Sequence, residues 1–469
     1  MNKGIITTYV LVFGAIFLLL LSGLLGFILL QLRQAEQRLA WNQSLHIAEA
    51  GFNYYRWCLN NEVEQNCQAQ KDYFDPAGNL VGQFLIEDDF ALTCGQITSR
   101  KITSAGWTNR FPNIKRKISI LYARESIAKN SYILNDNVWI GADHEIRGPY
   151  HSNGGIRFDG ENQSLVTSAR ETWLCTASFG CDYINCPSRC SREGSACRCP
   201  GVFTTTNNSR PDLFEFPVPP FDFEGVTIDL ARIKEITSAY PWQYYWPVIT
   251  DIDSQGKGYH LKFLDNGTFE VWIITKLKQT LAYDLEWGWH DDYSEIEEEY
   301  RYGNPIAIDP NCSLIFIEDN LWLEGKIKGK VTVVSANLID PNKDANVILK
   351  GNIDYLRKDG SDGLAVIGQR NVLIGPDSPD KMELKGILVA QKGWFGRKHY
   401  PDNIKEKLEI TGSVVSNGRV GTKWISGSQV VSGYLKRESY YDPNLVYNPP
   451  PFTPYLSSDF KIVNWEEIE

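Results

Sequence analysis

The residues IITTYVLVFGAIFLLLLSGLLGFILL, at positions 5–30, decide the plan of this chain. They form a run of 26 residues without a charged side chain, and a helix needs only ~20 apolar residues to span a bilayer core. A cleaved secretory signal has a shorter apolar core and a cleavage site of small residues, which the following QLRQ does not provide. We therefore predict a helix that anchors the protein in a membrane.

The charges around this run predict its orientation. Lys3 and the terminal amino group precede it, whereas Arg33 and Arg38, partly offset by Glu36, follow it. Positive charge before the run favours an N-terminus on the inside. We expect a single-pass protein with most of the chain extracytoplasmic, at the cell surface or in a surface filament.

The helix is expected to continue beyond the membrane. Apolar residues recur at helical spacing, and the first proline is Pro76. These apolar positions are Leu32, Ala35, Leu39, Ile47, Ala50, Tyr54 and Leu59. The pattern predicts one helix over residues 5–59, about 80 Å long, in a domain that comprises residues 1–60.

Two motifs in this region resemble a known family. Lys3-Gly4 followed directly by an apolar helix resembles the prepilin signal of type IV pilins, and LHIAEAG at 45–51 resembles the "AEAG" stretch of PilX-type minor pilins. The resemblance implies that a prepilin peptidase cuts between Gly4 and Ile5. Major pilins carry a glutamate five residues into the mature chain, where this sequence has Tyr9, so it does not imply filament entry by the major-pilin route.

Residues 61–130 predict a small β domain. Strands are expected at 83–86, 96–99 and 118–122, and DPAGN at 75–79 is a turn signal. These features predict a short antiparallel sheet packed on the exposed half of the helix. The resemblance implies that this unit is pilin-like.

The remainder, residues 131–469, contains a repeated strand motif of the form apolar-x-Gly-x-apolar. It is centred on Gly325, Gly351, Gly386 and Gly412, at spacings of 26, 35 and 26 residues, and Gly148 marks a possible earlier copy. Repeats of this length indicate stacked coils that bury their inward side chains against their neighbours. We interpret the fold class as α+β and mainly β, with a right-handed parallel β-helix here; a β-sandwich with glycine turns is the alternative.

Two further stretches resemble bacterial pilin-associated β-solenoid proteins. GPYHSNGGI at 148–156 is similar to their "GPxHSNG" turn, and YYDPNL at 440–445 followed by PPPF at 449–452 is similar to their ending. The resemblance implies a β-solenoid, which would carry a Cys-rich insertion (170–202) and an α/β insertion (213–305).

The ten cysteines predict disulfides, because the chain beyond the anchor is expected in an oxidising compartment. Cys186 and Cys190 have spacing compatible with zinc, but the Cys-rich insertion has no histidine, so a zinc site would need four thiolates. The sequence does not choose the pairing. The candidates are Cys58, Cys67, Cys94, Cys175, Cys181, Cys186, Cys190, Cys197, Cys199 and Cys312.

The α/β insertion contains local signals of its own. Residues 224–238 are compatible with a helix, and DNG at 265–267 between apolar alternating runs predicts a hairpin. Residues 286–302 combine two tryptophans with many acidic residues. We expect a solvated acidic loop there, with a partner- or cation-binding rim as the alternative.

Motifs of catalysis and metal binding are weak. DIDSQG at 251–256 begins like a calcium loop, but Lys262 occupies the position of the required glutamate. Asp143, His151 and Ser152 could be imagined as a triad, yet the sequence has no G-x-S-x-G turn beside them. We expect no catalytic residues, no metal and no cofactor, and we interpret His151 as a structural turn residue.

The net charge of −10 argues against nucleic acid as a partner, because phosphates demand cationic surface. The resemblance implies a non-enzymatic, minor-pilin-like protein that acts in pilus assembly or surface display. Its partners would be the membrane, other pilin subunits, pilus assembly proteins and the prepilin peptidase. Alternatives are a membrane-anchored adhesin or glycan-binding protein and a polysaccharide-active enzyme.

Overall fold

The computed structural model of the chain describes residues 3–60, 67, 70–94, 96–182, 184, 186–224, 228–241, 243–249, 257–310, 312–427, 429–456 and 460–468. A long apolar N-terminal helix precedes a mostly β region, which confirms this part of the sequence prediction. The chain divides into two compact units. The first comprises Met1–Ala91, Ile97–Ala123 and Phe460–Glu469, and the second comprises Leu92–Gln96 and Arg124–Asp459.

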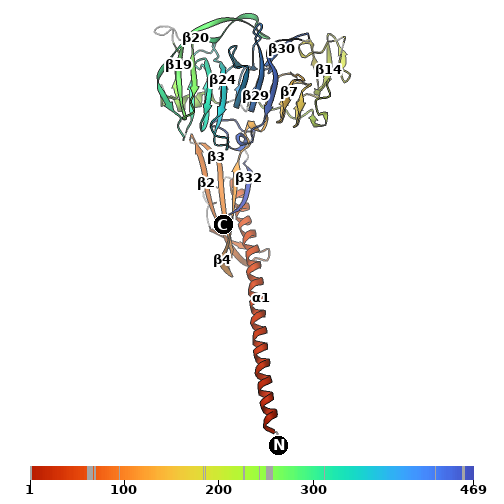
Figure 1. The fold of residues 1–469 in the computed structure, drawn as a ribbon, viewed down its shortest axis with the longest axis vertical. Helices are drawn as coiled ribbons and strands as arrows, with labels where there is room; N and C mark the ends of the chain where they lie inside the picture. Colours follow the sequence, from red (N-terminus) through yellow and green to blue (C-terminus); the bar gives the residue numbers. More distant parts are fainter. Residues whose placement is uncertain are drawn as a thin grey trace. The chain divides into compact units, whose positions relative to one another are not determined.

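The first unit consists of one helix and one sheet. The helix is α1 (Lys3–Asn60), and the sheet has the order β1-β2-β3-β4-β32. Figure 1 shows these strands beside the C-terminal half of α1. The strands are β1 (Gln70–Phe74), β2 (Leu80–Thr93), β3 (Gln96–Thr108), β4 (Phe111–Ala123) and β32 (Lys461–Ile468).

The second half of α1 packs closely on this sheet. A Cβ atom on Gly106 of β3 would lie 2.4 Å from the backbone nitrogen of Ala48, so only glycine allows this approach. Burial of apolar side chains from both elements provides the driving force. The buried core comprises Ile47, Ala48, Phe52, Tyr55, Cys58, Cys67, Phe84, Ile86, Ile102, Ile118, Ile120 and Tyr122.

The last strand of the chain belongs to the first unit. β32 pairs antiparallel with β4, with Trp465 opposite Ile120. This differs from the expected boundary, which assigned all of residues 131–469 to one β domain. The strand is short and mostly exposed, so its sequence has little of the apolar alternation that would reveal a buried strand.

The second unit is built mostly from short strands, with a few longer ones and a few short helices. The strands are β5 (Tyr132–Leu134), β6 (Val138–Ile140), β7 (His144–Ile146), β8 (Tyr150–Ser152), β9 (Ile156–Phe158), β10 (Glu161–Asn162), β11 (Val166–Ser168), β12 (Thr172–Cys175), β13 (Ser191–Glu193), β14 (Ala196–Pro200), β15 (Val202–Phe203), β16 (Phe214–Glu215), β17 (Tyr245–Trp246), β18 (Tyr259–Phe263), β19 (Thr268–Asp284), β20 (Gly288–Ala307), β21 (Leu314–Ile317), β22 (Leu321–Ile327), β23 (Lys330–Ser335), β24 (Val347–Tyr355), β25 (Gly363–Gly368), β26 (Val372–Ile374), β27 (Lys381–Ala390), β28 (Phe395–Gly396), β29 (Ile404–Ser416), β30 (Lys423–Ser426) and β31 (Gln429–Tyr440). The helices are η2 (Ile127–Lys129), η3 (Ala177–Phe179), η4 (Pro211–Leu213), α2 (Leu230–Thr237) and α3 (Asn444–Tyr447).

Most of these strands pair in parallel with strands that are not their immediate neighbours in sequence. One continuous ladder runs β21-β23-β25-β27-β29-β5-β8-β11-β16. The step from β29 to β5 joins the late part of the unit to its beginning, with Val414 opposite Tyr132. In Figure 1 the blue strand β29 accordingly lies near the orange strand β7. Buried apolar side chains fill the interior behind the ladder.

Rows of identical side chains accompany the ladder. Asn135 Nδ2 donates to Asn417 Oδ1 at 2.8 Å, and Asn153 Nδ2 donates to Asn135 Oδ1 at 2.8 Å. The row therefore passes over the same β29-to-β5 step. A second row joins Asn371 to Asn346 at 2.9 Å. The side chains of the first row lie just after their strands and those of the second row just before theirs, and in both rows the amides bond to one another.

Two of the four glycines of the repeated motif lie in this ladder, and the other two, Gly325 and Gly351, lie in β22 and β24. Gly386 and Gly412 stand opposite each other in β27 and β29, with φ angles of +140° and +133°. A Cβ on Gly412 would lie 2.1 Å from the carbonyl oxygen of Gly386. Both the backbone conformation and the contact between strands therefore require glycine here.

The α/β insertion differs in part from its prediction. The expected hairpin forms between β18 and β19. The expected helix over 224–238 is shorter, since α2 comprises Leu230–Thr237 and begins at the N-cap Asp229. β17 and β18 also pair in parallel with β21 and β22, so the parallel pairing begins inside this insertion.

Candidate functional site

The apolar half of α1 is the first candidate site. All side chains at positions 6–30 are exposed. Within the described part of the chain α1 alone is long and apolar enough to cross a membrane, with an 18-residue window of mean hydropathy 2.7. Gly4 and Ile5 lie in the first turns of this helix, where their side chains are outside the described structure. Cleavage between them stays a prediction.

The second half of α1 uses small residues for packing. Ala48 is fully buried, and a Cβ on Gly51 would lie 2.8 Å from the ring of Phe84. The Ser44 hydroxyl donates to the Ile114 carbonyl oxygen of β4 at 2.9 Å. The AEAG motif therefore holds the helix against the sheet.

All ten cysteines are paired in disulfides. The pairs are Cys58–Cys67, Cys94–Cys312, Cys175–Cys181, Cys186–Cys197 and Cys190–Cys199. Three of the five bonds lie in the Cys-rich insertion, which has few core residues of its own. Disulfides of this kind stabilise a segment by limiting the conformations of its unfolded state.

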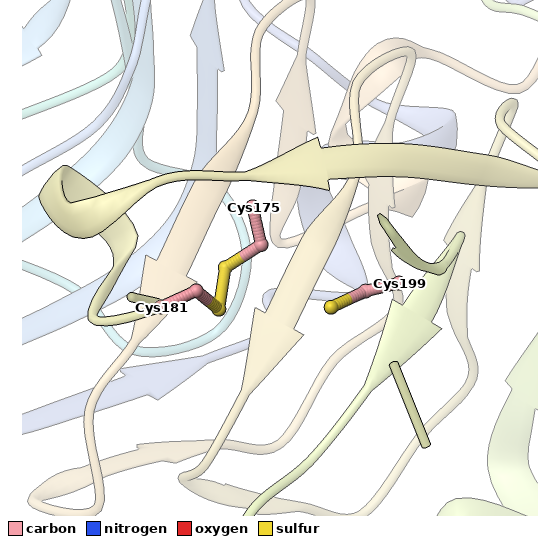
Figure 2. A group of neighbouring side chains, drawn as sticks. All are labelled: Cys175, Cys181 and Cys199. Atoms are coloured by element: carbon pink, nitrogen blue, oxygen red, sulfur yellow. A yellow bond between two sulfur atoms is a disulfide. The ribbon is translucent and has the colours of Figure 1, made fainter. Parts of the chain in front are cut away.

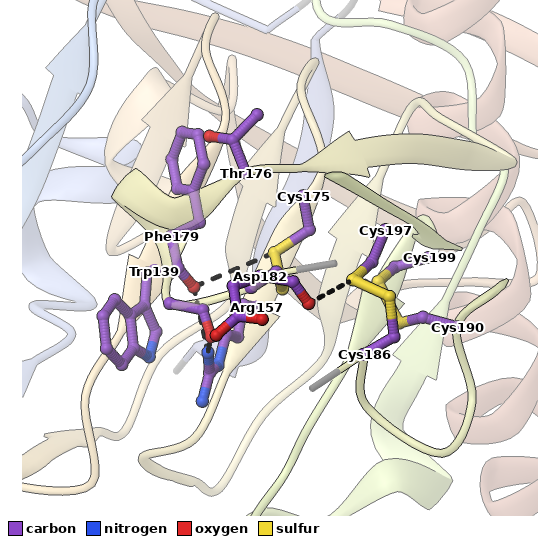
Figure 3. Close-up of a disulfide and its surroundings, with 12 residues drawn as sticks. Trp139, Arg157, Cys175, Thr176, Phe179, Asp182, Cys186, Cys190, Cys197 and Cys199 are labelled. Carbon is purple, nitrogen blue, oxygen red and sulfur yellow. Dashed lines mark hydrogen bonds between the residues drawn. A yellow bond between two sulfur atoms is a disulfide. The ribbon is translucent and has the colours of Figure 1, made fainter. Parts of the chain in front are cut away.

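Two arginines fix this insertion to the rest of the second unit. Arg157 donates to the carbonyl oxygens of Phe179 and Gly180 at 3.0 and 2.7 Å, and Arg419 donates to that of Ser178 at 2.9 Å. The Arg157 guanidinium also lies 4.4 Å from the centre of the Trp139 ring (Figure 3). The η3 turn is thereby held through its backbone.

The zinc alternative does not fit the chemistry of these sulfurs. Sulfur atoms of Cys175, Cys181 and Cys199 lie within 4.8 Å of one another (Figure 2). Cys175 and Cys181 are bonded to each other, however, and Cys199 is bonded to Cys190. Because zinc binds thiolates, sulfurs in disulfides cannot serve as its ligands.

The imagined triad is not assembled. His151 Nδ1 contacts Thr167 Oγ1 at 2.9 Å and its Nε2 contacts Asn153 Oδ1 at 3.0 Å, while Ser152 donates to the Asp136 carbonyl oxygen. Asp143 binds Arg437 and Lys423 instead, and their charges help to lower its pKa against the effect of burial. These residues have structural partners, not catalytic ones.

Two further candidates from the sequence are the calcium-like stretch and the acidic stretch. The calcium-like residues 251–256 lie outside the described structure. The acidic stretch 286–302 is not a loop, because most of it is strand β20, which forms a long antiparallel ribbon with β19. Its exposed face mixes aromatic and acidic residues, and pairing with β19 satisfies its backbone.

Sequence reasoning missed the polar anchor beneath this ribbon. Lys398 Nζ donates to Asp292 Oδ1 at 2.9 Å and to His290 Nε2 at 3.0 Å. The Tyr400 hydroxyl donates to Asp292 Oδ2 at 3.1 Å, and burial together with the Asp292 charge raises the pKa of Tyr400. No motif could have identified this group, since His290 and Asp292 are separated from Lys398 and Tyr400 by more than 100 residues.

A second buried polar group joins three strands. His260 of β18 lies 2.9 Å from a carboxylate oxygen of Glu299 and 3.3 Å from one of Glu324. Burial opposes a charge on the imidazole, but the two carboxylates outweigh it and raise the pKa of His260. The ring hydrogen-bonds Glu299 through Nδ1, and Glu324 faces its Nε2 as an ion-pair partner.

Comparisons with known proteins are sparse. No protein-family model matches the chain, and no curated protein matches it. Among solved structures, the chain is similar to the crystal structure of competence-associated pilin ComZ from Thermus thermophilus, with a TM-score of 0.30 and 11% identity. The match covers 92% of this chain and 97% of that chain. At that level the similarity assigns no function.

Proposed function

We propose that this chain is a non-enzymatic, membrane-anchored, minor-pilin-like structural protein of a type IV pilus or a related filament. The observation that carries the proposal is the division of α1. Its first half leaves apolar side chains at positions 6–30 exposed, and its second half is packed on a sheet.

An apolar surface of this extent requires a cover. Soluble monomers rarely expose contiguous apolar patches larger than a few hundred Å². A bilayer would supply the cover before assembly, and the apolar helices of neighbouring subunits would supply it in a filament core. The mechanism is therefore packing: the helix exchanges lipid contacts for contacts with other helices.

The second unit would be the displayed part. We interpret its parallel ladder as the stacked coils of a β-solenoid, supported by the matching register of Gly386 and Gly412 and by the asparagine rows. Its disulfides would stabilise it outside the cell, with the N-terminus of α1 on the inner side of the membrane.

Processing by a prepilin peptidase tests the proposal. Hydrolysis of the Gly4–Ile5 bond would leave a carboxylate on Gly4 and a new amino terminus on Ile5. The full chain is expressed with and without the peptidase, and the N-terminus of the product is sequenced. Gly4→Val should block cleavage, whereas Gly14→Val, where an added Cβ meets nothing within 4 Å, should not.

A product that keeps Met1 in the presence of active peptidase would contradict the proposal. The second candidate, a membrane-anchored adhesin, is favoured by Tyr9 at the position where major pilins have glutamate. Shearing of the cells separates the two functions. The proposed subunit appears in the sheared filament fraction, and an adhesin outside filaments stays with the membranes.

A further inference from the structure

One face of the β19–β20 ribbon carries exposed aromatic side chains around a carboxylate. Trp289, Asp291 and Tyr293 follow at every second position of β20, so they share this face. On β19, Tyr283 lies opposite Trp289 and Leu281 lies opposite Asp291. We call these five residues the aromatic–acidic face.

The face is exposed, and neighbouring rings hold Trp289 in place. Trp289 is 55% exposed and Tyr293 is 50% exposed. The centre of the Trp289 ring lies 5.5 Å from that of Tyr283 and 5.0 Å from that of His399, and the polar anchor of Lys398 and Asp292 fixes the opposite side of the ribbon. Rings ordered in advance lose little entropy when they bind a partner.

The charge of the ribbon identifies the sign of such a partner. Residues 268–307 contain nine Asp or Glu and three Lys or Arg. Each of the three basic residues already has a glutamate partner: Lys276 pairs with Glu297, Lys278 with Glu295 and Arg301 with Glu270. Within the described structure Asp291 has no basic partner. An anionic polymer would be repelled here, and a cation would be attracted.

The same protein shows which cation suits this combination of groups. Arg157 lies 4.4 Å from the centre of the Trp139 ring and pairs with Asp159 at 2.6 Å. A guanidinium is thus held between an indole face and a carboxylate, an arrangement that gains both cation–π and charge-assisted hydrogen-bond energy. Trp289 and Asp291 offer the same two groups, exposed and without the arginine.

We propose that the aromatic–acidic face docks an arginine-bearing segment of another polypeptide. One guanidinium lies over Trp289 and binds Asp291, and an apolar part of the segment contacts Tyr293 and Leu281. This inference does not depend on the proposed filament function, because it uses only the geometry and charge of the second unit.

Peptide binding to the full chain in nanodiscs of zwitterionic lipid tests the proposal. The probe is a short fluorescent peptide of alternating arginine and serine, and its companion replaces arginine with citrulline, which keeps the size and removes the charge. The expected result is binding of the arginine peptide that weakens with salt, with little binding of the citrulline peptide. The double variant Trp289→Ala/Asp291→Asn should weaken binding about tenfold or more.

The matched control is Trp465→Ala/Glu466→Gln, which removes the same two types of group from β32 and should leave binding unchanged. Because Trp289 also contacts Tyr283 and His399, Asp291→Asn alone and Tyr293→Ser provide variants that disturb the ribbon less, and each should weaken binding. Equal binding by the ribbon variants and the control would overturn the proposal. Equal binding of the citrulline peptide would also overturn it. Binding of cellohexaose that depends on the ribbon, without binding of the arginine peptide, would overturn it as well and would make the face a surface for uncharged glycans.

Discussion

Replacing Gly412 by alanine should destabilise the second unit strongly. Gly412 has a φ of +133°, and its added Cβ would lie 2.1 Å from the carbonyl oxygen of Gly386. That oxygen belongs to the backbone of β27, in a ladder paired on both sides. It cannot move away as the end of a flexible side chain could.

The expected magnitude follows from two costs. Holding a residue other than glycine in this backbone region costs ~1–3 kcal/mol. Forcing an extra methyl group into a packed site costs a further ~1–3 kcal/mol. Together they predict a loss of about 4 kcal/mol in the free energy of unfolding.

Urea unfolding of the full chain in nanodiscs, followed by tryptophan fluorescence, measures the loss. With a slope of ~3 kcal/mol per molar urea, the midpoint should fall by about 1 M or more. Two glycines serve as controls. Gly421→Ala adds a Cβ with nothing within 4 Å, and Gly351→Ala, in the same sequence motif, meets only the Glu324 side chain.

Gly421→Ala should change the free energy of unfolding by less than ~1 kcal/mol. Gly351→Ala displaces the Glu324 side chain, a partner of His260, so its loss should lie between those of Gly421→Ala and Gly412→Ala. If Gly412→Ala shifts the midpoint no more than Gly421→Ala does, the close approach of β27 and β29 is wrong. If Gly351→Ala is as damaging as Gly412→Ala, the motif acts through glycine in general and not through the backbone contact described here.

Three further changes probe other parts of the molecule. Glu299 and Glu324 raise the pKa of His260, so the protonated ring should stabilise the ribbon fully below pH ~6.5. This stabilisation should be lost as the pH rises through the higher folded-state pKa. His260→Gln should therefore flatten the pH dependence of stability, measured by urea unfolding from pH 5.5 to 9. Cys190→Ser should lower the local stability of the Cys-rich insertion by ~2–4 kcal/mol and expose it to a protease while the ladder stays folded. Unchanged proteolysis would show that this disulfide is not needed. Deletion of residues 460–468 removes β32 and uncovers β4, so backbone amides of β4 should exchange hydrogen faster, and unchanged exchange would contradict the pairing.

Local rules explain what could be predicted from the residues. The uncharged run at 5–30 and the absence of proline before Pro76 predict α1, since helix formation depends on neighbours three and four positions apart. The DNG turn predicts the β18–β19 hairpin for the same reason, because a two-stranded hairpin closes through adjacent residues. The even number of cysteines, all beyond the apolar run, predicts disulfides as a class.

Acidic composition obscured strand β20. Residues 289, 291 and 293 are exposed, whereas the alternate positions Asp292 and Ser294 are buried. Those buried residues are polar, so the usual apolar alternation of a strand is missing. They are acceptable in the interior because Lys398 and Tyr400, contributed from far along the chain, satisfy Asp292.

Pairing over long distances was decided only by the folded chain. Any of the short apolar strands could stack on any other, since parallel pairing needs little more than similar length and an inward apolar pattern. The folded chain takes the arrangement that buries all of these surfaces at once. That arrangement decides the contact of β29 with β5, the disulfide partner of each cysteine and the place of β32 beside β4. The apolar helix, in contrast, can be predicted from consecutive residues. An uncharged run at positions 5–30 that suits an apolar surrounding depends on each residue and its nearest neighbours alone.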